Sequence, residues 1–439
     1  MPLARRLLLL AALAFVGLLT LTPRPYQAPA SAATPWTCLL CGDLGTVDVL
    51  LNIALFVPLG MALRWLGLSG ARPVMVGLAV SLAVELLQAT VIPGRDPSLS
   101  DLLTNTAGTW LGSGLAGAAP LWLWPSPQSA RRLAAAASVV WLGMLAGTGW
   151  LLQPVMSPGT RELRWAPPVP FLERFAGQVL GTELNGVPSD SGLIDPEHLG
   201  RRLAQGKVSL TAAITVVSWP EIAAPVAEVS SVDSVAVVRL SQLGQKVLFS
   251  VRTRSADFLL RTPAAKVYRA LPEPAGQAVT IGGSLDADLL TAFTKVGGRT
   301  DSAAVRISPG LGWALVLPLT FYPFDYRPDI TSAVWTALPL LLVGYWGGRS
   351  QGTHSIGKEL PSRATARTAV LGCAGLLLTT GLGAIPPLTG TARQGWEAWV
   401  ACIAALLLGG LAARYASAGT VAVATPAAEP PRARRASSP

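Results

Sequence analysis

The chain is 439 residues long; 51% of the residues are hydrophobic and only 13% are charged, whereas soluble domains carry about 25% charged residues. Its mean hydropathy is +0.47 and its formal net charge is +10. This composition excludes an ordinary soluble protein. Because the arginines lie beside apolar segments, the positive charge indicates membrane orientation and argues against nucleic-acid binding.

Apolar runs long enough to cross a bilayer recur along the chain and predict about eight transmembrane helices. Five belong to a first region, residues 1–153, and three to a last region, residues 311–415. The runs are Leu7 to Leu21, Val47 to Leu66, Val74 to Ile92, Leu102 to Trp124, Leu133 to Leu152, Ile330 to Trp346, Thr368 to Leu388 and Trp396 to Ala413. The first run is either a retained helix, which we favour, or a signal peptide cleaved near Ala30.

Basic residues predict the orientation of these helices. They fall at one set of helix ends, at Arg5 and Arg6, Arg64 and Arg72, Arg131 and Arg132, Arg349 to Arg367, and Arg432 to Arg435. The positive-inside rule then places both termini in the cytoplasm and residues 155–310 outside it. The last residues, 416–439, are basic and proline-bearing, which is typical of a disordered cytoplasmic tail.

Residues 154–310 have the pattern of a β domain inserted between the helices. Val208 to Val216 alternate at every second position, as do Val247 to Val251, which predicts strands with one buried face. Regular strand spacing without helical interludes predicts an extracytoplasmic β-sandwich. The segment VRLSQLGQKVLFSVRTRSADFLLRTP resembles the concanavalin A-like lectin and laminin G-like sandwich. That resemblance implies carbohydrate or protein binding, and a spacer or partner-docking role stays open.

Polar side chains interrupt three of the N-terminal apolar runs. They form pairs three or four residues apart, so each pair lies on one side of its helix. The pairs are Asp48 and Asn52, Glu85 and Gln88, and Asp101 and Asn105, with Arg95 and Asp96 in the loop between the last two helices. On the expected topology all of them lie near the outer face. A carboxylate at membrane depth is costly and by default marks a functional site.

These motifs closely resemble the VanZ-like family of membrane proteins. The resemblance rests on DVLLNIALFVPLG, VELLQ, GRDPSLSD and NTAGTWLG, and it covers roughly the first third of the chain. It implies a link to glycopeptide (teicoplanin) resistance and no settled biochemical activity. In the last motif, Gly108 and Gly112 form a small-xxx-small face that predicts close approach of another helix.

Three interpretations of the polar cluster stay open: a ligand site, a structural network that includes an Arg95 salt bridge to Glu85 or Asp101, and an acid/base site. Catalysis ranks third. His198 and His354 lie far from the cluster in sequence, and the usual nucleophile and metal motifs are absent from the sequence. No catalytic residue, metal or cofactor is therefore predicted.

Four cysteines suggest one disulfide. Cys38 and Cys41 form a CxxC pair in the first external loop, where oxidation is expected. Cys373 and Cys402 lie within apolar runs and are expected to act as small hydrophobic residues.

The sequence thus predicts a multi-pass protein of the bacterial cytoplasmic (inner) membrane that acts at its outer face. Expected partners are membrane lipids and a lipid, glycan or glycopeptide-like ligand from the cell envelope, and no nucleic acid. Two other classes stay open: a membrane enzyme that acts on a lipid headgroup, with Glu85 or Asp101 as acid or base, and a scaffold whose sandwich docks an envelope protein.

Overall fold

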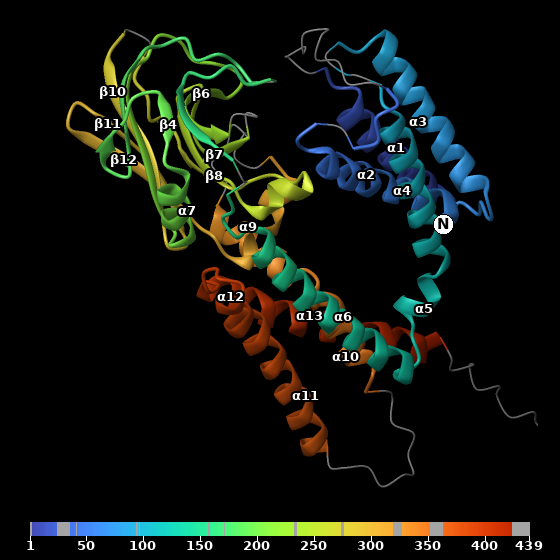
Figure 1. Ribbon diagram of the computed structural model, residues 1–439. Helices are drawn as coiled ribbons and strands as arrows, with labels where there is room; N and C mark the ends of the chain where they lie inside the picture. The colour runs from blue at the N-terminus through green and yellow to red at the C-terminus, as the bar shows by residue number, and fades with distance from the viewer. Residues whose placement is uncertain are drawn as a thin grey trace, which may run out of the picture.

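The computed structural model describes residues 2–23, 36–40, 42–93, 95, 97–156, 159–170, 172–231, 235–273, 276–318, 327–351 and 363–423. Along the chain they form an N-terminal helical bundle, a two-sheet β domain and a C-terminal helical group. Figure 1 shows the β domain at upper left, the bundle at right and the C-terminal helices below them.

The N-terminal bundle contains the helices α1 (Pro2–Thr20), α2 (Gly45–Trp65), α3 (Arg72–Thr90) and α4 (Leu99–Gly117). Its apolar interior joins Ala12 and Val16 of α1 to Phe56 and Leu59 of α2 and Val84 of α3. α1 therefore packs against α2 and α3, and whether it is retained or cleaved as a signal peptide stays a prediction. The short α5 (Ala119–Leu123) and the long α6 (Pro127–Leu151) then lead to the β domain.

Seven helical segments of the described residues are long and apolar enough to cross a membrane. They are Leu3–Thr20, Gly45–Trp65, Arg72–Thr90, Pro127–Leu151, Pro328–Arg349, Val370–Leu388 and Trp396–Ala416. The sequence predicts about eight. The run predicted from Leu102 to Trp124 forms α4 and α5, which are separated at Ala118, and it is not among the seven. Asp101 and Asn105 contribute to this difference, because each lowers the hydropathy of α4.

Two antiparallel six-stranded sheets form the β domain, in the orders β4-β1-β6-β7-β8-β9 and β12-β11-β10-β5-β2-β3. The strands are β1 (Arg161–Trp165), β2 (Val179–Leu184), β3 (Val187–Pro188), β4 (Gly192–Ile194), β5 (Lys207–Thr215), β6 (Ala224–Ser231), β7 (Ala236–Leu243), β8 (Lys246–Val251), β9 (Ala264–Val267), β10 (Ala278–Asp286), β11 (Leu289–Val296) and β12 (Arg299–Arg306). The predicted sandwich architecture is confirmed at this level.

The two sheets enclose one apolar core, as the period-two pattern predicts. Along β5 every second residue from Val208 to Ile214 is buried, and in β8 Val247 and Phe249 are buried. The same core takes in Leu152 from the end of α6 and Leu315 from α8 (Gly312–Val316), beyond the predicted bounds of 154 and 310. The sandwich is thus packed together with the chain segments that enter and leave it.

The prediction of a domain without helical interludes is wrong. Helix α7 (Pro196–Ala204) lies between β4 and β5, and a 3-10 helix, η2 (Arg254–Phe258), follows β8. The side chain of Asp195 caps α7 by accepting hydrogen bonds from the backbone N–H of Glu197 and His198, and Pro196 occupies the first turn. Such start signals could have revealed this helix in the sequence.

The C-terminal group consists of α9 (Pro328–Ala337), α10 (Leu340–Arg349), α11 (Arg363–Leu378), the π-helical turn η4 (Thr379–Ala384), α12 (Ile385–Leu388) and α13 (Trp396–Val423). It packs on α6 around a core that contains Trp141, Leu145, Leu340, Leu382 and Cys402. α13 continues to Val423, past the predicted start of the tail at 416, and residues 424–439 lie outside the described part of the chain.

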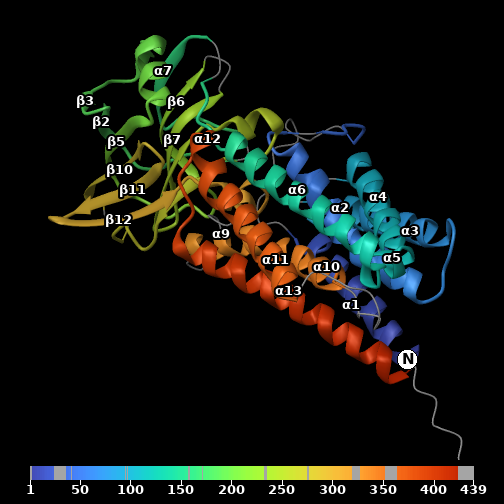
Figure 2. The same cartoon turned by 90° about the horizontal axis from the view of Figure 1, so that it is seen from below.

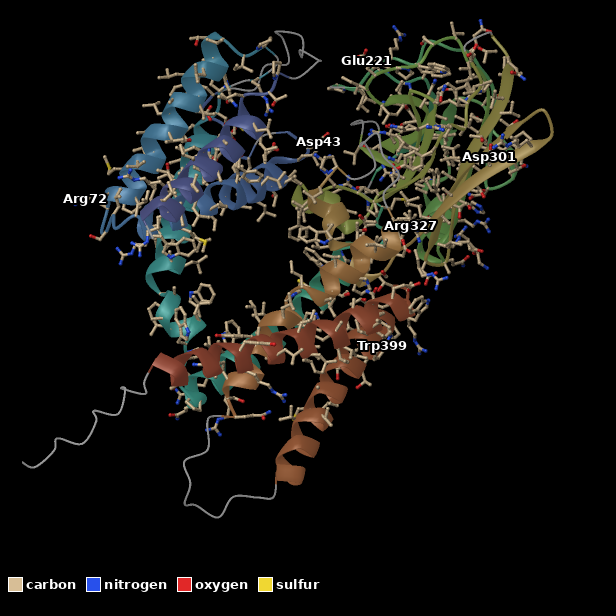
Figure 3. All side chains as sticks on the ribbon, turned by 180° about the vertical axis from the view of Figure 1, so that it is seen from behind. Asp43, Arg72, Glu221, Asp301, Arg327 and Trp399 are labelled. Carbon is tan, nitrogen blue, oxygen red and sulfur yellow. The ribbon has the colours of Figure 1, made fainter. Side chains whose placement is uncertain are left out.

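The sandwich lies at one end of the long helices. In Figure 2, α6 and α13 run from the side of the sandwich toward the side on which the N-terminus is labelled. Figure 3 shows Arg72 at the end of the bundle far from the sandwich and Asp43 on the side facing it. Arg72, one of the basic residues on which the predicted topology rests, thus lies away from the sandwich, and the assignment of the two sides to inside and outside stays a prediction.

Candidate functional site

The predicted polar residues meet at the end of the bundle where α3 ends and α4 begins. Asn52 of α2 donates a hydrogen bond from Nδ2 to Oδ1 of Asp101 in the first turn of α4, at 2.8 Å. Asp48, one turn earlier in α2, is exposed. Asn52 and Asp101 therefore lie on the facing sides of α2 and α4.

Glu85 is buried at the same level, with 8% of its surface exposed. Its Oε2 accepts a hydrogen bond of 2.7 Å from the backbone N–H of Ser98. Ser98 is the N-cap of α4, and its hydroxyl accepts in turn from the N–H of Ser100 at 3.1 Å. The positive end of the α4 dipole favours a carboxylate at this place. Glu85 and Asp101 therefore lie at one helix N-terminus.

Arg95 and Gln88 form hydrogen bonds with the end of α1, whereas the sequence suggested a salt bridge for Arg95. Arg95 donates from Nη2 to the carbonyl of Leu19 at 2.9 Å and from Nε to that of Thr22 at 3.3 Å. Gln88 donates to the carbonyl of Thr20 at 2.9 Å. These carbonyls belong to the end of α1 and the residues just after it, so Arg95 and Gln88 fasten α1 to the bundle. The considered salt bridge from Arg95 to Glu85 or Asp101 is replaced by these contacts.

Asn105 lies one turn deeper than Asp101 and is only 2% exposed. Its Nδ2 donates to the hydroxyl of Ser81 on α3 at 3.0 Å. Its Oδ1 is buried and has no hydrogen-bond partner in the structure. A buried polar atom without a partner costs free energy. The polar layer therefore continues inward from the carboxylates and ends at a buried acceptor for which the described residues supply no donor.

Glycines hold the helices that carry this cluster at backbone contact. A Cβ added at Gly108 would lie 2.3 Å from the carbonyl oxygen of Ile53, and one at Gly112 would lie 2.0 Å from that of Val57. The predicted small-xxx-small face of α4 thus meets α2. Gly60 of α2 lies in the family motif DVLLNIALFVPLG, but its packing role was not predicted: an added Cβ there would lie 2.1 Å from the carbonyl oxygen of Thr109. Its position in the sequence motif, two residues after Pro58, was the signal that could have indicated a close helix contact.

A short loop segment, residues 36–40, covers the start of α4. The carbonyl of Trp36 accepts from the N–H of Leu99 at 2.9 Å, and the carbonyl of Leu39 accepts from the hydroxyl of Ser100 at 2.7 Å. Cys38, between them, is disulfide-bonded. Its predicted partner Cys41 lies outside the described residues, as does Asp96, so both predictions stay open. Cys373 and Cys402 are free thiols.

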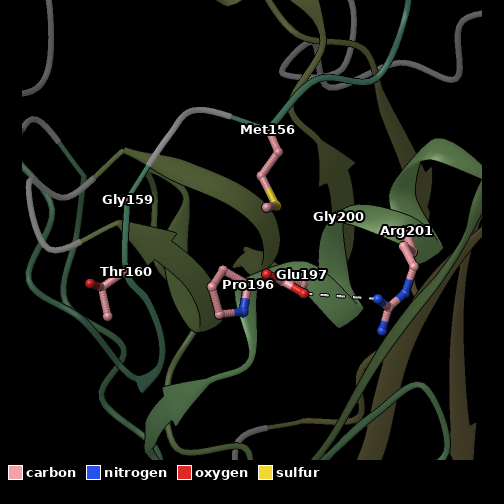
Figure 4. Close-up of a pocket in the computed structure, with 7 residues that line it drawn as sticks. All are labelled: Met156, Gly159, Thr160, Pro196, Glu197, Gly200 and Arg201. Carbon is pink, nitrogen blue, oxygen red and sulfur yellow. Dashed lines mark ion pairs between the residues drawn. The ribbon is translucent and has the colours of Figure 1, made fainter.

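The sandwich has its own surface depression, of about 740 Å³, beside α7. It is lined by Met156, Gly159, Thr160, Pro196, Glu197, Gly200 and Arg201, and Glu197 and Arg201 form an ion pair of 4.0 Å across one turn (Figure 4). The neighbouring Arg161 is fully buried, and burial together with the charge of Arg252 lowers the pKa of its guanidinium. This depression is wide and belongs to the sandwich, not to the polar cluster.

The structure offers little for metal or histidine chemistry in the residues that it describes. None of their histidine, cysteine and acidic side chains form a group of three that could hold a metal ion. His198 is exposed on α7, far from the bundle in sequence and fold, and His354 lies outside the described residues. The groups available at the cluster are therefore carboxylates, amides and hydroxyls.

Comparison with known families identifies the N-terminal region. A family model described as VanZ/LLP1 matches residues 8–121, which contain all the polar residues of the cluster. This part of the chain is therefore VanZ-like, as the motifs predict. The match ends before the sandwich. No curated protein and no solved structure matches the chain significantly.

Proposed function

We propose that the VanZ-like bundle binds a polar ligand of the bacterial cell envelope at the outer face of the cytoplasmic membrane. The ligand would be a lipid headgroup, a glycan or a glycopeptide-like molecule. The burial of Glu85 carries this proposal: among the helical side chains that the structure describes, it is the only charged one that is buried. A charge at membrane depth is expensive and is typical of a functional position.

The chemistry of the cluster favours a ligand that donates hydrogen bonds. The nitrogens of Asn52, Gln88 and Arg95 already donate to protein acceptors, whereas the unsatisfied Oδ1 of Asn105 is an acceptor. Carboxylates are acceptors as well when ionised. Hydroxyl, amine and amide groups would match this arrangement, and sugars and peptides present all of them.

The experiment compares the Glu85→Gln and Asp101→Asn variants with the parent protein in a deletion strain. Each change keeps the shape of the side chain and removes its charge. We expect both variants to reach normal membrane abundance and to leave the lipid and peptidoglycan profile, and any change in glycopeptide susceptibility, as in the deletion strain.

Thr90→Val supplies a matched control at the end of α3. The Thr90 hydroxyl bonds only within its own helix, to the carbonyl of Leu86, and the residue is exposed. This variant should restore the parental profile. Abundant and fully active Glu85 and Asp101 variants would remove the bundle as the binding site. Variants that still bind a photoreactive ligand analogue but no longer alter the profile would instead indicate acid/base chemistry.

The sandwich has a role of its own in this proposal: binding cell-wall glycan or docking an envelope protein. The wide depression beside α7 supports it, because a shallow surface suits extended ligands better than small molecules. A soluble fragment covering residues 152–316 includes the Leu152 and Leu315 contributions to the core. It should retain peptidoglycan fragments or an envelope partner on a column; failure with both leaves the sandwich as a spacer.

A further inference from the structure

The joint between α6 and the sandwich is rigid. Just beyond α6, the Gln153 carbonyl accepts from the backbone N–H of Arg254 at 2.9 Å, and the Gln153 Oε1 accepts from the Arg254 guanidinium at 2.6 Å. Pro154 forms a β-bridge with Thr253. Gln153 also donates to the carbonyl of Thr389, between α12 and α13, at 2.8 Å. The position of η2 is therefore fixed relative to the end of a membrane-spanning helix.

Two aromatic rings protrude at this joint. Trp150, in the last turn of α6, is 43% exposed, and Phe258, at the end of η2, is 47% exposed. Their ring centroids are 5.4 Å apart in an edge-to-face contact. The guanidinium of Arg254 lies 4.5 Å from the Trp150 ring centroid. We call Trp150, Arg254 and Phe258 the aromatic corner.

The aromatic corner has the composition of a membrane interface. Aromatic residues concentrate where a transmembrane helix leaves the hydrocarbon, because their rings prefer the headgroup layer. The Arg254 guanidinium, held on the Trp150 ring and by Gln153, places a positive charge at this level, which suits the lipid phosphates. Since α6 is apolar enough to span a membrane up to Leu151, Trp150 must lie near one membrane surface, and the contact with Trp150 brings Phe258 to the same level.

We propose that the aromatic corner is inserted into the lipid headgroup layer and holds the sandwich against the membrane surface. The partner is the phospholipid of the leaflet on the side of the sandwich. This inference does not depend on the polar cluster binding a ligand. It also does not depend on which side of the membrane the sandwich occupies.

Trp219 provides an internal control. It is 40% exposed, close to the value for Trp150. Pro220, which follows it, accepts a hydrogen bond from Gly244 in the turn before β8, whereas η2 follows the other end of β8. Trp219 therefore lies at the end of the sandwich opposite the aromatic corner, and Figure 3 shows the nearby Glu221 there.

The test is hydroxyl-radical footprinting of the unmodified full-length protein in nanodiscs of phosphatidylcholine and phosphatidylglycerol. We expect Trp150 and Phe258 to be oxidised several-fold more slowly than Trp219. Equal oxidation of Trp150 and Trp219 would overturn the proposal. So would protection that appears only in nanodiscs holding two copies, because a second chain would then cover the corner.

A spin label distinguishes lipid from protein cover directly. The label is attached at Phe258→Cys in a Cys373→Ala, Cys402→Ala background, with a label at Val187→Cys on the exposed β3 as the comparison. At position 258 we expect collisions with oxygen, which dissolves in lipid, to exceed those with a water-soluble nickel chelate; at 187 we expect the reverse. A label at 258 that is shielded from both reagents would contradict lipid insertion.

Discussion

In both the N-terminal bundle and the C-terminal helical group, glycines bring helix backbones into contact, but the two groups bury different side chains. In the bundle, Gly112 places α4 against the backbone of α2, and in the C-terminal group an added Cβ at Gly344 would lie 2.2 Å from the carbonyl oxygen of Leu406. Yet the polar side chains buried in the described part of the C-terminal group, such as Thr336 and Gln394, are all uncharged, whereas the bundle buries Glu85.

This difference indicates what the polar residues are for. The described helices of the C-terminal group are joined by glycine contacts, apolar packing and hydrogen bonds of uncharged groups, such as that from Trp141 to Thr336, without a buried charged side chain. Polar residues used only as membrane glue contribute little, about 0.6 kcal/mol per hydrogen bond on average. Burying Glu85 is therefore hard to explain by packing alone, and this favours the ligand-site interpretation over the purely structural one.

The largest effect is expected from a substitution that disrupts the glycine contact between two helices. Gly112→Leu would drive a side chain into the Val57 carbonyl, which is 2.0 Å from the added Cβ, whereas a Cβ added at Gly114 meets nothing within 4 Å. Overpacking a tight contact costs about 1–3 kcal/mol or more, so the Gly112 variant should unfold at a clearly lower temperature or fail to accumulate. Gly114→Leu should not. Thermal unfolding in detergent measures both, and equal behaviour would show that α2 and α4 are not in backbone contact.

A smaller loss is expected in the apolar group. Trp141 is fully buried and donates from Nε1 to the carbonyl of Thr336 at 2.7 Å. Trp141→Phe removes that hydrogen bond and should lower stability by about 1–3 kcal/mol. Trp110→Phe on the exposed face of α4 is the control and should change stability by less than about 0.5 kcal/mol. Binding at the polar cluster should be unaffected in both; a loss of binding in Trp141→Phe would couple the two helical groups.

The contact between Asn52 and Asp101 should be weaker still. A double-mutant cycle with Asn52→Ala and Asp101→Ala should give a coupling free energy of about 0.6 kcal/mol, with an upper value near 1.7 kcal/mol. The readout is equilibrium unfolding in mild detergent and denaturant. A coupling of zero would mean that the 2.8 Å hydrogen bond is not maintained in the membrane; a far larger value would favour a structural role for the cluster.

No effect is expected at Cys373. This thiol is free and exposed on α11, away from the polar cluster. Cys373→Ala should leave abundance, thermal stability and the envelope profile unchanged within error. Loss of function in an abundant Cys373→Ala protein would assign the C-terminal group a role beyond packing.

Local patterns predicted much of this architecture. The alternation from Val208 to Val216 identified β5 and its buried face, because a half-buried strand constrains every second residue. The spacing of Asn52, Asp101 and Asn105 identified one side of each helix, because a helix repeats every 3.6 residues. Both patterns are set within one element and can be read without knowing its neighbours.

Contacts between distant elements could not be read in this way. Arg95 has the charge to pair with Glu85, and only the fold shows that its guanidinium is directed to the carbonyls at the end of α1. Gly60 contacts Thr109 only because of the way α2 is rotated about its own axis relative to α4, which the sequence does not specify. The short α7 was missed because its few residues carry too little apolar periodicity to separate it from a loop, although Asp195 and Pro196 mark its start.

The backbone contact between α2 and α4 also limits how the bundle can move. Where carbonyl oxygens of one helix rest against glycines of the other, little space is left for either helix to shift, so we expect α2 and α4 to move together. α3 meets α4 through side chains, such as the hydrogen bond from Asn105 to Ser81, and α1 is fastened by the hydrogen bonds of Gln88 and Arg95. We therefore expect a response to ligand binding at the cluster to move α1 or α3 relative to the pair formed by α2 and α4.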